Sequence, residues 1–238
     1  MYAQPAPEAA HLGTAKFGLG LALGPQVGSH LMAVSSLQHK APGETLFAEG
    51  DETDSVYEMV RGMVRLYKLL PDGRRQITGF LSAGQFLGLA PEGVCVFTAE
   101  AITEVTVCRY KRTAFERLID EVPGFARRLL AVTSHELHAA QDQMLLLGRK
   151  SATEKVASFL LLIADRHVND KGEDGAVEVP MTRGDIADYL GLTIETVSRT
   201  LTKLKNDGLI SLPVPARIEI CDHVRLEELA AGECDGGL

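Results

Sequence analysis

Hydrophobic and polar positions change their spacing along the chain, and the first clear pattern is that of short strands. Between about residues 37 and 110, short runs of β-branched and aromatic residues alternate with glycines. Gly50, Gly62, Gly73 and Gly84 fall 12, 11 and 11 residues apart, and a Pro-Asp pair before Gly73 is typical of a tight turn. Regular turns between short strands predict an antiparallel jelly-roll or β-roll.

After Pro123 the spacing becomes that of a long helix. Large apolar residues recur every seven positions, at Leu130, Leu137 and Met144. Three residues after each of them stand Thr133, Ala140 and Leu147, which complete the seam. This seam suits a parallel pair of helices, because small side chains at the intervening positions allow close approach. It therefore predicts a homodimer. The alternative is that the same face packs on the β-roll of its own chain.

Two short helices separated by a glycine are predicted further on. The sequence TRGD at 182–185 has capping-box spacing and opens the first helix, which Gly191 ends. Thr193 can cap a second helix that runs to about Asn206. This order is the layout of a helix-turn-helix.

Two β-prone runs, at 209–212 and 217–220, follow the second helix. They predict a hairpin, or wing, in which Arg217 is placed to reach a phosphate. A helix-turn-helix followed by a wing is more specific for DNA binding than either part alone.

The second helix carries one outer stripe suited to reading bases. Glu195, Ser198 and Arg199 lie at i, i+3 and i+4, so they share a face. Arg199 can bond to O6 and N7 of guanine, Glu195 can accept from the amino group of cytosine, and Ser198 is permissive. Ile194 can contact a thymine methyl group. The alternative is a solvated stripe with a Glu195–Arg199 salt bridge.

Charge by itself argues against DNA binding. The chain has a net charge of −8, and residues 150–223 hold nine Lys and Arg against twelve Asp and Glu, or −3. From Arg199 to Arg217, however, the count is four basic residues against Asp207, or +3. The face presented to phosphate matters more than the total, so the motifs decide the question.

Composition excludes several other classes of protein. With 45% hydrophobic and 24% charged residues, the chain is typical of a soluble globular protein. The longest apolar candidate, 17–34, is interrupted by glycines, so no membrane partner is expected. Four cysteines without a CxxC pair favour reduced thiols in the cytoplasm. No nucleophile–base set, P-loop or Rossmann motif is present, so an enzyme is not expected.

Over about residues 40–230 the sequence resembles the CRP/FNR superfamily of transcription regulators, and within it the FixK-type branch. Five segments carry the resemblance: FAEGD at 47–51, GRRQITGF at 73–80, LLGRK at 146–150, MTRGDI at 181–186 and LTIETVSR at 192–199. The resemblance implies a β-roll sensor domain, a long dimer helix and a winged DNA-binding domain.

The resemblance also implies roles for particular residues. Positions that touch the DNA backbone in the family are matched by Thr182, Arg183, Thr193, Thr196 and Lys203. The surface that contacts RNA polymerase in FNR-like relatives is matched by the turn containing Leu69, Asp72, Gly73 and Arg74. Ser198, where cyclic-AMP-responsive members carry glycine, implies the half-site TTGA.

The β-roll lacks the groups that bind known effectors of the family. In the cyclic-nucleotide members an arginine holds the phosphate, but here residues 76–108 contain no Lys or Arg. Oxygen-sensing members hold an iron–sulfur cluster on N-terminal cysteines, and the first 94 residues contain none. No cofactor and no metal are therefore expected. The alternative is a ligand-gated sensor with haem or another small effector in the β-roll.

The predicted fold class is α+β, with the chain divided into five segments. They are a flexible N-terminal arm at 1–36, a β-roll at 37–118, a dimerisation helix at 119–148, a winged helix-turn-helix domain at 149–223 and a C-terminal tail at 224–238. The predicted function is that of a homodimeric cytoplasmic transcription regulator, mainly an activator. Its expected partners are RNA polymerase and double-stranded DNA with a TTGA-N6-TCAA-like palindrome.

Overall fold

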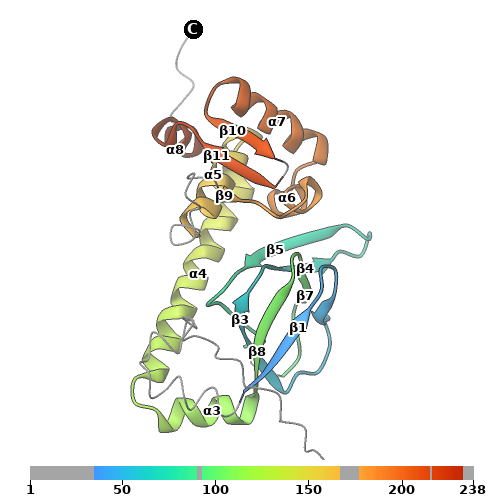
Figure 1. Cartoon of the computed structure of the whole chain (residues 1–238), viewed down its shortest axis with the longest axis vertical. Coiled ribbons are helices and arrows are strands. Elements are labelled where there is room, and N and C mark those ends of the chain that lie inside the picture. The colour runs from blue at the N-terminus through green and yellow to red at the C-terminus, as the bar shows by residue number, and fades with distance from the viewer. Residues whose placement is uncertain (1–34, 90–92, 167–176, 215, 233–238) are drawn as a thin grey trace, which may run out of the picture.

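The computed structural model describes residues 35–89, 93–166, 177–214 and 216–232. A long helix runs along one side of the molecule and joins a β-roll to a smaller helical domain (Figure 1). Of the predicted N-terminal arm, residues 1–34 lie outside the described ranges, and Ser35 and Ser36 already belong to the first strand.

The β-roll consists of two antiparallel four-stranded sheets, as the spacing of short strands predicted. The first sheet has the order β1-β8-β3-β6, with strands at Ser35–Lys40, Val105–Lys111, Ser55–Arg61 and Phe86–Leu87. The second has the order β2-β7-β4-β5, with strands at Thr45–Phe47, Thr98–Ala101, Val64–Leu69 and Arg75–Leu81. Apolar side chains of both sheets, among them Met59, Val64 and Val107, are fully buried between them.

Glycines close the predicted turns. Gly73, between β4 and β5, has φ +83°, and its N–H donates to Leu70 O at 2.9 Å. Gly62 has φ +87°, and a Cβ there would lie 2.1 Å from Glu104 O, so no other residue fits without a backbone shift.

Two helices follow the β-roll: α3 (Arg112–Glu121) and α4 (Phe125–Arg149). They are separate because Gly124, with φ +85°, breaks the path between them. The predicted dimerisation helix, 119–148, thus corresponds mainly to α4. One side of α4 packs against the β-roll through Leu129 and Val132.

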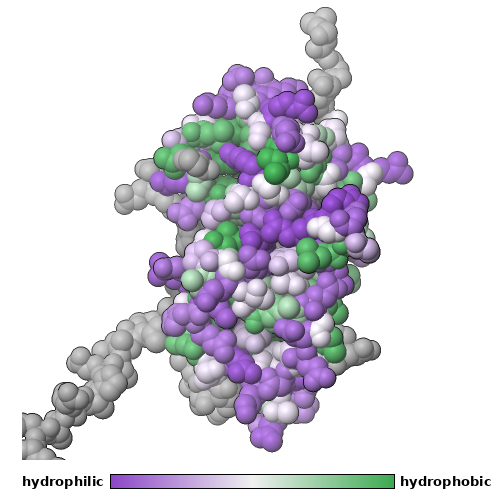
Figure 2. Space-filling view, turned by 90° about the vertical axis from the view of Figure 1, so that its right-hand side faces the viewer, coloured by the Kyte–Doolittle hydropathy of each residue, from purple (hydrophilic) through white to green (hydrophobic). Residues whose placement is uncertain are grey.

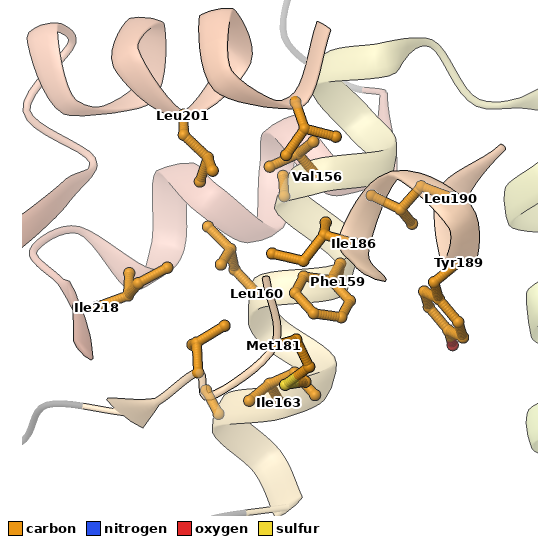
Figure 3. Packing of buried hydrophobic residues seen from close by; sticks show 14 of the residues in the cluster. Val156, Phe159, Leu160, Ile163, Met181, Ile186, Tyr189, Leu190, Leu201 and Ile218 are labelled. Carbon is orange, nitrogen blue, oxygen red and sulfur yellow. The ribbon is translucent and has the colours of Figure 1, made fainter. Parts of the chain in front are cut away.

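The C-terminal domain has a core built from four helices and a hairpin. Its helices are α5 (Ala152–Arg166), α6 (Arg183–Leu190), α7 (Ile194–Asn206) and α8 (His223–Ala231). A three-stranded sheet has the order β10-β11-β9, with strands at Ile210–Val214, Arg217–Ile220 and Val177–Glu178. Figure 3 shows apolar side chains of α5, α6, α7 and β11 meeting in this core. The predicted helix-turn-helix with a wing is confirmed.

Two details differ from the sequence prediction. The segment 224–238 was expected to be a tail, but α8 packs on α5, with Leu226 0% and Ala230 6% exposed. An N-cap at Asp222 and apolar residues four apart explain this helix. The wing strand β10 also continues to Val214, past the expected end at 212.

Candidate nucleic-acid interface

The predicted caps fix both helices of the helix-turn-helix. The Thr182 hydroxyl accepts from the Asp185 N–H at 3.1 Å, and the Asp185 carboxylate accepts from the Thr182 N–H at 3.0 Å. Gly191 ends α6 with φ +62°, and Thr193 accepts from the Thr196 N–H at 3.2 Å to open α7. Local sequence thus determines the angle at which α7 leaves the turn.

The residues expected to read bases are exposed together at the start of α7. Glu195, Ser198 and Arg199 are all exposed, and Ile194 is 52% exposed beside them. The buried face of the same helix holds Val197, Thr200, Leu201 and Leu204. The helix therefore presents this stripe to solvent and not to its own core.

The structure does not contain the Glu195–Arg199 salt bridge. The ion pairs within the described ranges do not join these two side chains. The pKa of Glu195 is lowered first by hydrogen bonds from its own backbone and from Thr193, and only then by the charge of Arg199. The alternative of a Glu195–Arg199 salt bridge is thus not found, and hydrogen bonds at the start of the helix act on the Glu195 pKa more strongly than the charge of Arg199 does. Arg199 is left available for a partner outside the chain.

The residues matched to backbone-contacting positions lie around this stripe. Thr182, Thr193 and Lys203 are exposed, whereas Arg183 and Thr196 are partly buried. A Cβ on Gly184 would lie 3.5 Å from Thr182 Oγ1 and 3.8 Å from Ile194 Cδ1, so the starts of α6 and α7 adjoin.

On the wing, Arg217 is also partly buried. Its Nε is buried without a hydrogen-bond partner in the part of the chain that the structure describes. Its guanidinium is thus less free to reach a phosphate than the wing position suggested.

A cluster of ion pairs between the β-roll and α6 was not predicted. Asp185 is 1% exposed, and its Oδ1 accepts from Arg65 Nη1 at 3.0 Å and from Arg75 Nη2 at 2.7 Å. Arg75 Nε also donates to Asp188 Oδ2 at 2.8 Å, and Arg65 pairs with Glu100. More than 100 residues separate the two arginines from Asp185 and Asp188 in sequence, so no local signal could have found these contacts.

The predicted dimer seam lies on the outer side of α4. Leu130, Leu137 and Met144 are 66%, 58% and 70% exposed, and Thr133 and Ala140 are exposed with them. The alternative, in which this face packs on the β-roll of its own chain, therefore does not hold. Leu147 differs, because it is partly buried against the core of the C-terminal domain.

The β4–β5 turn projects from the β-roll. Leu69 is 64% exposed, and Arg74 pairs with Asp72 at 2.7 Å. Figure 2 shows hydrophilic residues gathered at mid-height on this side of the molecule, with small hydrophobic patches between them. The turn is thus accessible to a partner.

Within the β-roll the two cysteines are buried. Cys95 and Cys108 are each 3% exposed, and burial raises the pKa of both thiols. Cys108 lies on strand β8, whereas Cys95 lies between β6 and β7. In the described ranges, no group of three or more His, Cys, Asp or Glu side chains is arranged to hold a metal ion. No helix there has both the length and the apolar character needed to cross a membrane.

Models of two domain families match the chain. Residues 37–122 match a cyclic nucleotide-binding domain, and residues 154–229 match a Crp-like helix-turn-helix domain. These ranges coincide with the β-roll and with the domain that carries α6 and α7.

Known proteins match over most of the chain. The nitrogen fixation regulation protein FixK of Bradyrhizobium diazoefficiens is 51% identical over 193 residues, which cover 81% of each chain. The transcriptional activatory protein AadR of Rhodopseudomonas palustris is 52% identical over 190 residues, covering 80% of this chain and 79% of AadR. The structure of FixK2 from Bradyrhizobium japonicum superposes with a TM-score of 0.77 at 40% identity, covering 82% of this chain and 97% of that one.

A β-roll joined by a long helix to a winged helix-turn-helix with an exposed stripe defines a two-domain, DNA-binding transcription regulator. Identities above 50% over four-fifths of the chain make the assignment specific. The chain belongs to the CRP/FNR superfamily of transcription regulators, in its FixK branch.

Proposed function

We propose that the protein is a homodimeric transcription activator that acts in the cytoplasm and binds an inverted repeat close to TTGA-N6-TCAA. The observation that carries this proposal is the exposed stripe of α7, on which Arg199 has no ion-pair partner within the described ranges. An arginine at this place can bond to both O6 and N7 of guanine. Glu195, kept ionised by the helix start, accepts from an amino group on the complementary strand.

The dimer follows from the exposed seam of α4. Three large apolar side chains in one row are costly to leave in water, and a second copy of α4 can cover them. Two-fold symmetry then places two copies of α7 on one side of the dimer, about one helical turn of DNA apart, so the site is palindromic.

The β4–β5 turn supplies the surface for RNA polymerase in this proposal. Leu69, Gly73 and the Asp72–Arg74 ion pair lie on an exposed turn that projects from the β-roll. The name of AadR, a transcriptional activatory protein, supports activation, and that of FixK supports a role in the regulation of nitrogen fixation. The resemblance to the FixK-type branch is the ground for the wider proposal of a role in micro-oxic or anaerobic metabolism, which includes respiration and denitrification.

We further propose that activity needs no obligatory effector. The β-roll matches a cyclic nucleotide-binding domain in fold, but residues 76–108 offer no cation for a phosphate. An absorbance spectrum of freshly purified protein separates this proposal from a haem-based sensor, because bound haem gives a Soret band. Such a band in stoichiometric amount would favour the sensor.

The proposal is tested by equilibrium binding to three duplexes of equal length at one salt concentration. They carry the full palindrome, one TTGA half-site, and a scrambled sequence of the same composition. The full palindrome is expected to bind at least about a thousandfold more tightly than the scrambled duplex. Equal affinity for all three would contradict sequence-specific reading by α7.

A further inference from the structure

The DNA-binding domain is attached to the rest of the chain at two places. The first is covalent: α4 ends at Arg149, Lys150 is extended with ψ 144°, and α5 begins at Ala152. The Lys150 ammonium donates to Ser158 Oγ and to Ala230 O, both at 2.8 Å, so this link is held against α5 and α8.

The second attachment joins β4 and β5 to α6. Arg65 and Arg75 both donate to the buried carboxylate of Asp185, and Arg75 also donates to Asp188. Beside these ion pairs, Gln76 Nε2 donates to Asp188 O at 2.8 Å. The ring centroids of Phe80, on β5, and Tyr189, on α6, lie 5.2 Å apart, which adds an apolar contact. Figure 1 shows β5 beside α6.

Together the two attachments fix the orientation of the domain. A body held at one link can still turn about that link, whereas a second contact on another helix removes this rotation. The polar contacts converge on α6, and Gly184 in the first turn of α6 lies next to Ile194 at the start of α7. A change in this contact therefore moves the reading helix with it.

The ion pairs also neutralise charge near the proposed DNA surface. Asp185 and Asp188 are two of the twelve acidic residues that make the domain net negative. A buried carboxylate without a cation is costly, and at this place it would also repel phosphate. The β-roll thus supplies two arginines that offset the charge of these carboxylates, with Arg65 shared between Asp185 and Glu100.

We propose that Arg65 and Arg75 are positioning residues that set the distance and rotation between the two α7 helices of the dimer. They thereby make binding selective for the spacing of the two half-sites. The inference rests on the proposed function, because it assumes that a dimer reads two half-sites.

Half-site spacing is a sensitive measure of this geometry. One base pair more or less shifts a half-site by about 3.4 Å along the DNA and turns it by about 35°. A rigidly held pair of helices cannot follow such a shift, whereas a pair held only by the α4–α5 link can follow part of it.

The test compares operators whose central spacer has six base pairs, one fewer, or one more, at fixed salt and with dimeric protein. The primary variant is Arg75→Gln, which breaks the bonds from Arg75 to both aspartates and leaves Arg65 on Asp185. The matched control is Arg109→Gln, which breaks an Arg–Asp pair of similar length, 2.9 Å to Asp54, within the β-roll.

The preference of Arg75→Gln for the six-base-pair spacer is expected to fall at least about tenfold, because this variant loses two charge-assisted hydrogen bonds, to Asp185 and to Asp188. Arg75→Lys keeps the charge but has one nitrogen in place of the planar fork, in which Nε reaches Asp188 and Nη2 reaches Asp185, so its spacing preference is expected to fall between those of Arg75→Gln and the wild type. Arg109→Gln is expected to keep the wild-type preference. A wild-type spacing preference in Arg75→Gln overturns the proposal, even if its overall affinity falls, because a purely structural role lowers affinity for every spacing alike.

A second variant covers the case in which Arg75→Gln is poorly folded. Asp188→Asn alters only the outer bond and leaves buried Asp185 with both arginines, and it is expected to relax spacing preference in the same direction. If Arg75→Gln cannot be purified, a wild-type preference of Asp188→Asn for the six-base-pair spacer also overturns the proposal. Failure of the proposed function would be seen separately, in the wild-type protein. It would then bind the palindromic operators no more tightly than scrambled DNA, whatever their spacer.

Discussion

The most demanding prediction for assembly concerns Leu137→Glu combined with Met144→Glu. Full burial of a Leu or Met side chain contributes about 1.5–3 kcal/mol. Leu130, Leu137 and Met144 are 66%, 58% and 70% exposed in the single chain, so roughly two-thirds of that, about 1–2 kcal/mol each, is left for a dimer to gain.

Three such residues on each of two helices give about 6–12 kcal/mol, and the double variant removes four of these six contributions, or about 4–8 kcal/mol. Dimerisation must also overcome an entropic cost of roughly 4–15 kcal/mol. The contribution that is left in the double variant, that of the two Leu130 side chains, is too small to hold the dimer. At 1.4 kcal/mol for each factor of ten, the dimer dissociation constant is expected to rise at least about a thousandfold. Repulsion between four added carboxylates along the seam acts in the same direction.

The assay is light scattering over a range of protein concentrations, followed by binding to the full palindrome. Val224→Glu is the matched control, because Val224 is an apolar residue of similar exposure, 63%, on α8 and does not belong to the seam. The variant is expected to be monomeric and the control dimeric. A double variant that remains dimeric and binds the palindrome with wild-type affinity would refute the assignment of the interface to this seam.

Three further predictions concern the reading surface and the turn on the β-roll. Lys203→Ala is expected to weaken binding to all sequences alike and to reduce the log–log salt slope by about one for each lost contact; an effect at one base position would contradict a phosphate contact. Asp72→Ala and Arg74→Ala are expected to abolish activation in vitro with DNA binding intact, and normal activation at every promoter would remove this role. Ser198→Gly is expected to shift preference toward the half-site of cyclic-AMP-responsive relatives, measured by competition between the two operators.

Features governed by neighbours in sequence could be predicted well. The caps at Thr182 and Thr193 and the turns at Gly73 and Gly191 depend on residues within one helical turn or one β-turn. The same holds for the exposed stripe of α7, because helical periodicity alone places its members on one face.

Features that depend on distant partners could not be predicted. Asp185 was expected only as a helix cap, yet Arg65 and Arg75 reach it across 120 and 110 positions of sequence. Helix α8 is a different case, because its N-cap at Asp222 and its buried Leu226 were visible in the sequence. The segment 224–238 was nevertheless expected to be a tail, although residues 223–231 form an amphipathic helix that packs on α5.

The central claim, that α7 reads a palindrome of TTGA-like half-sites, is tested most directly by selecting binding sites from random duplex DNA. Wild-type protein and Arg199→Ala are compared at the same salt concentration. The wild type is expected to recover an inverted repeat close to TTGA-N6-TCAA, and Arg199→Ala to lose about 1–3 kcal/mol per half-site, with preference relaxed chiefly at the G·C pair. A consensus without TTGA-like arms, or an unchanged G·C preference in Arg199→Ala, would contradict the account.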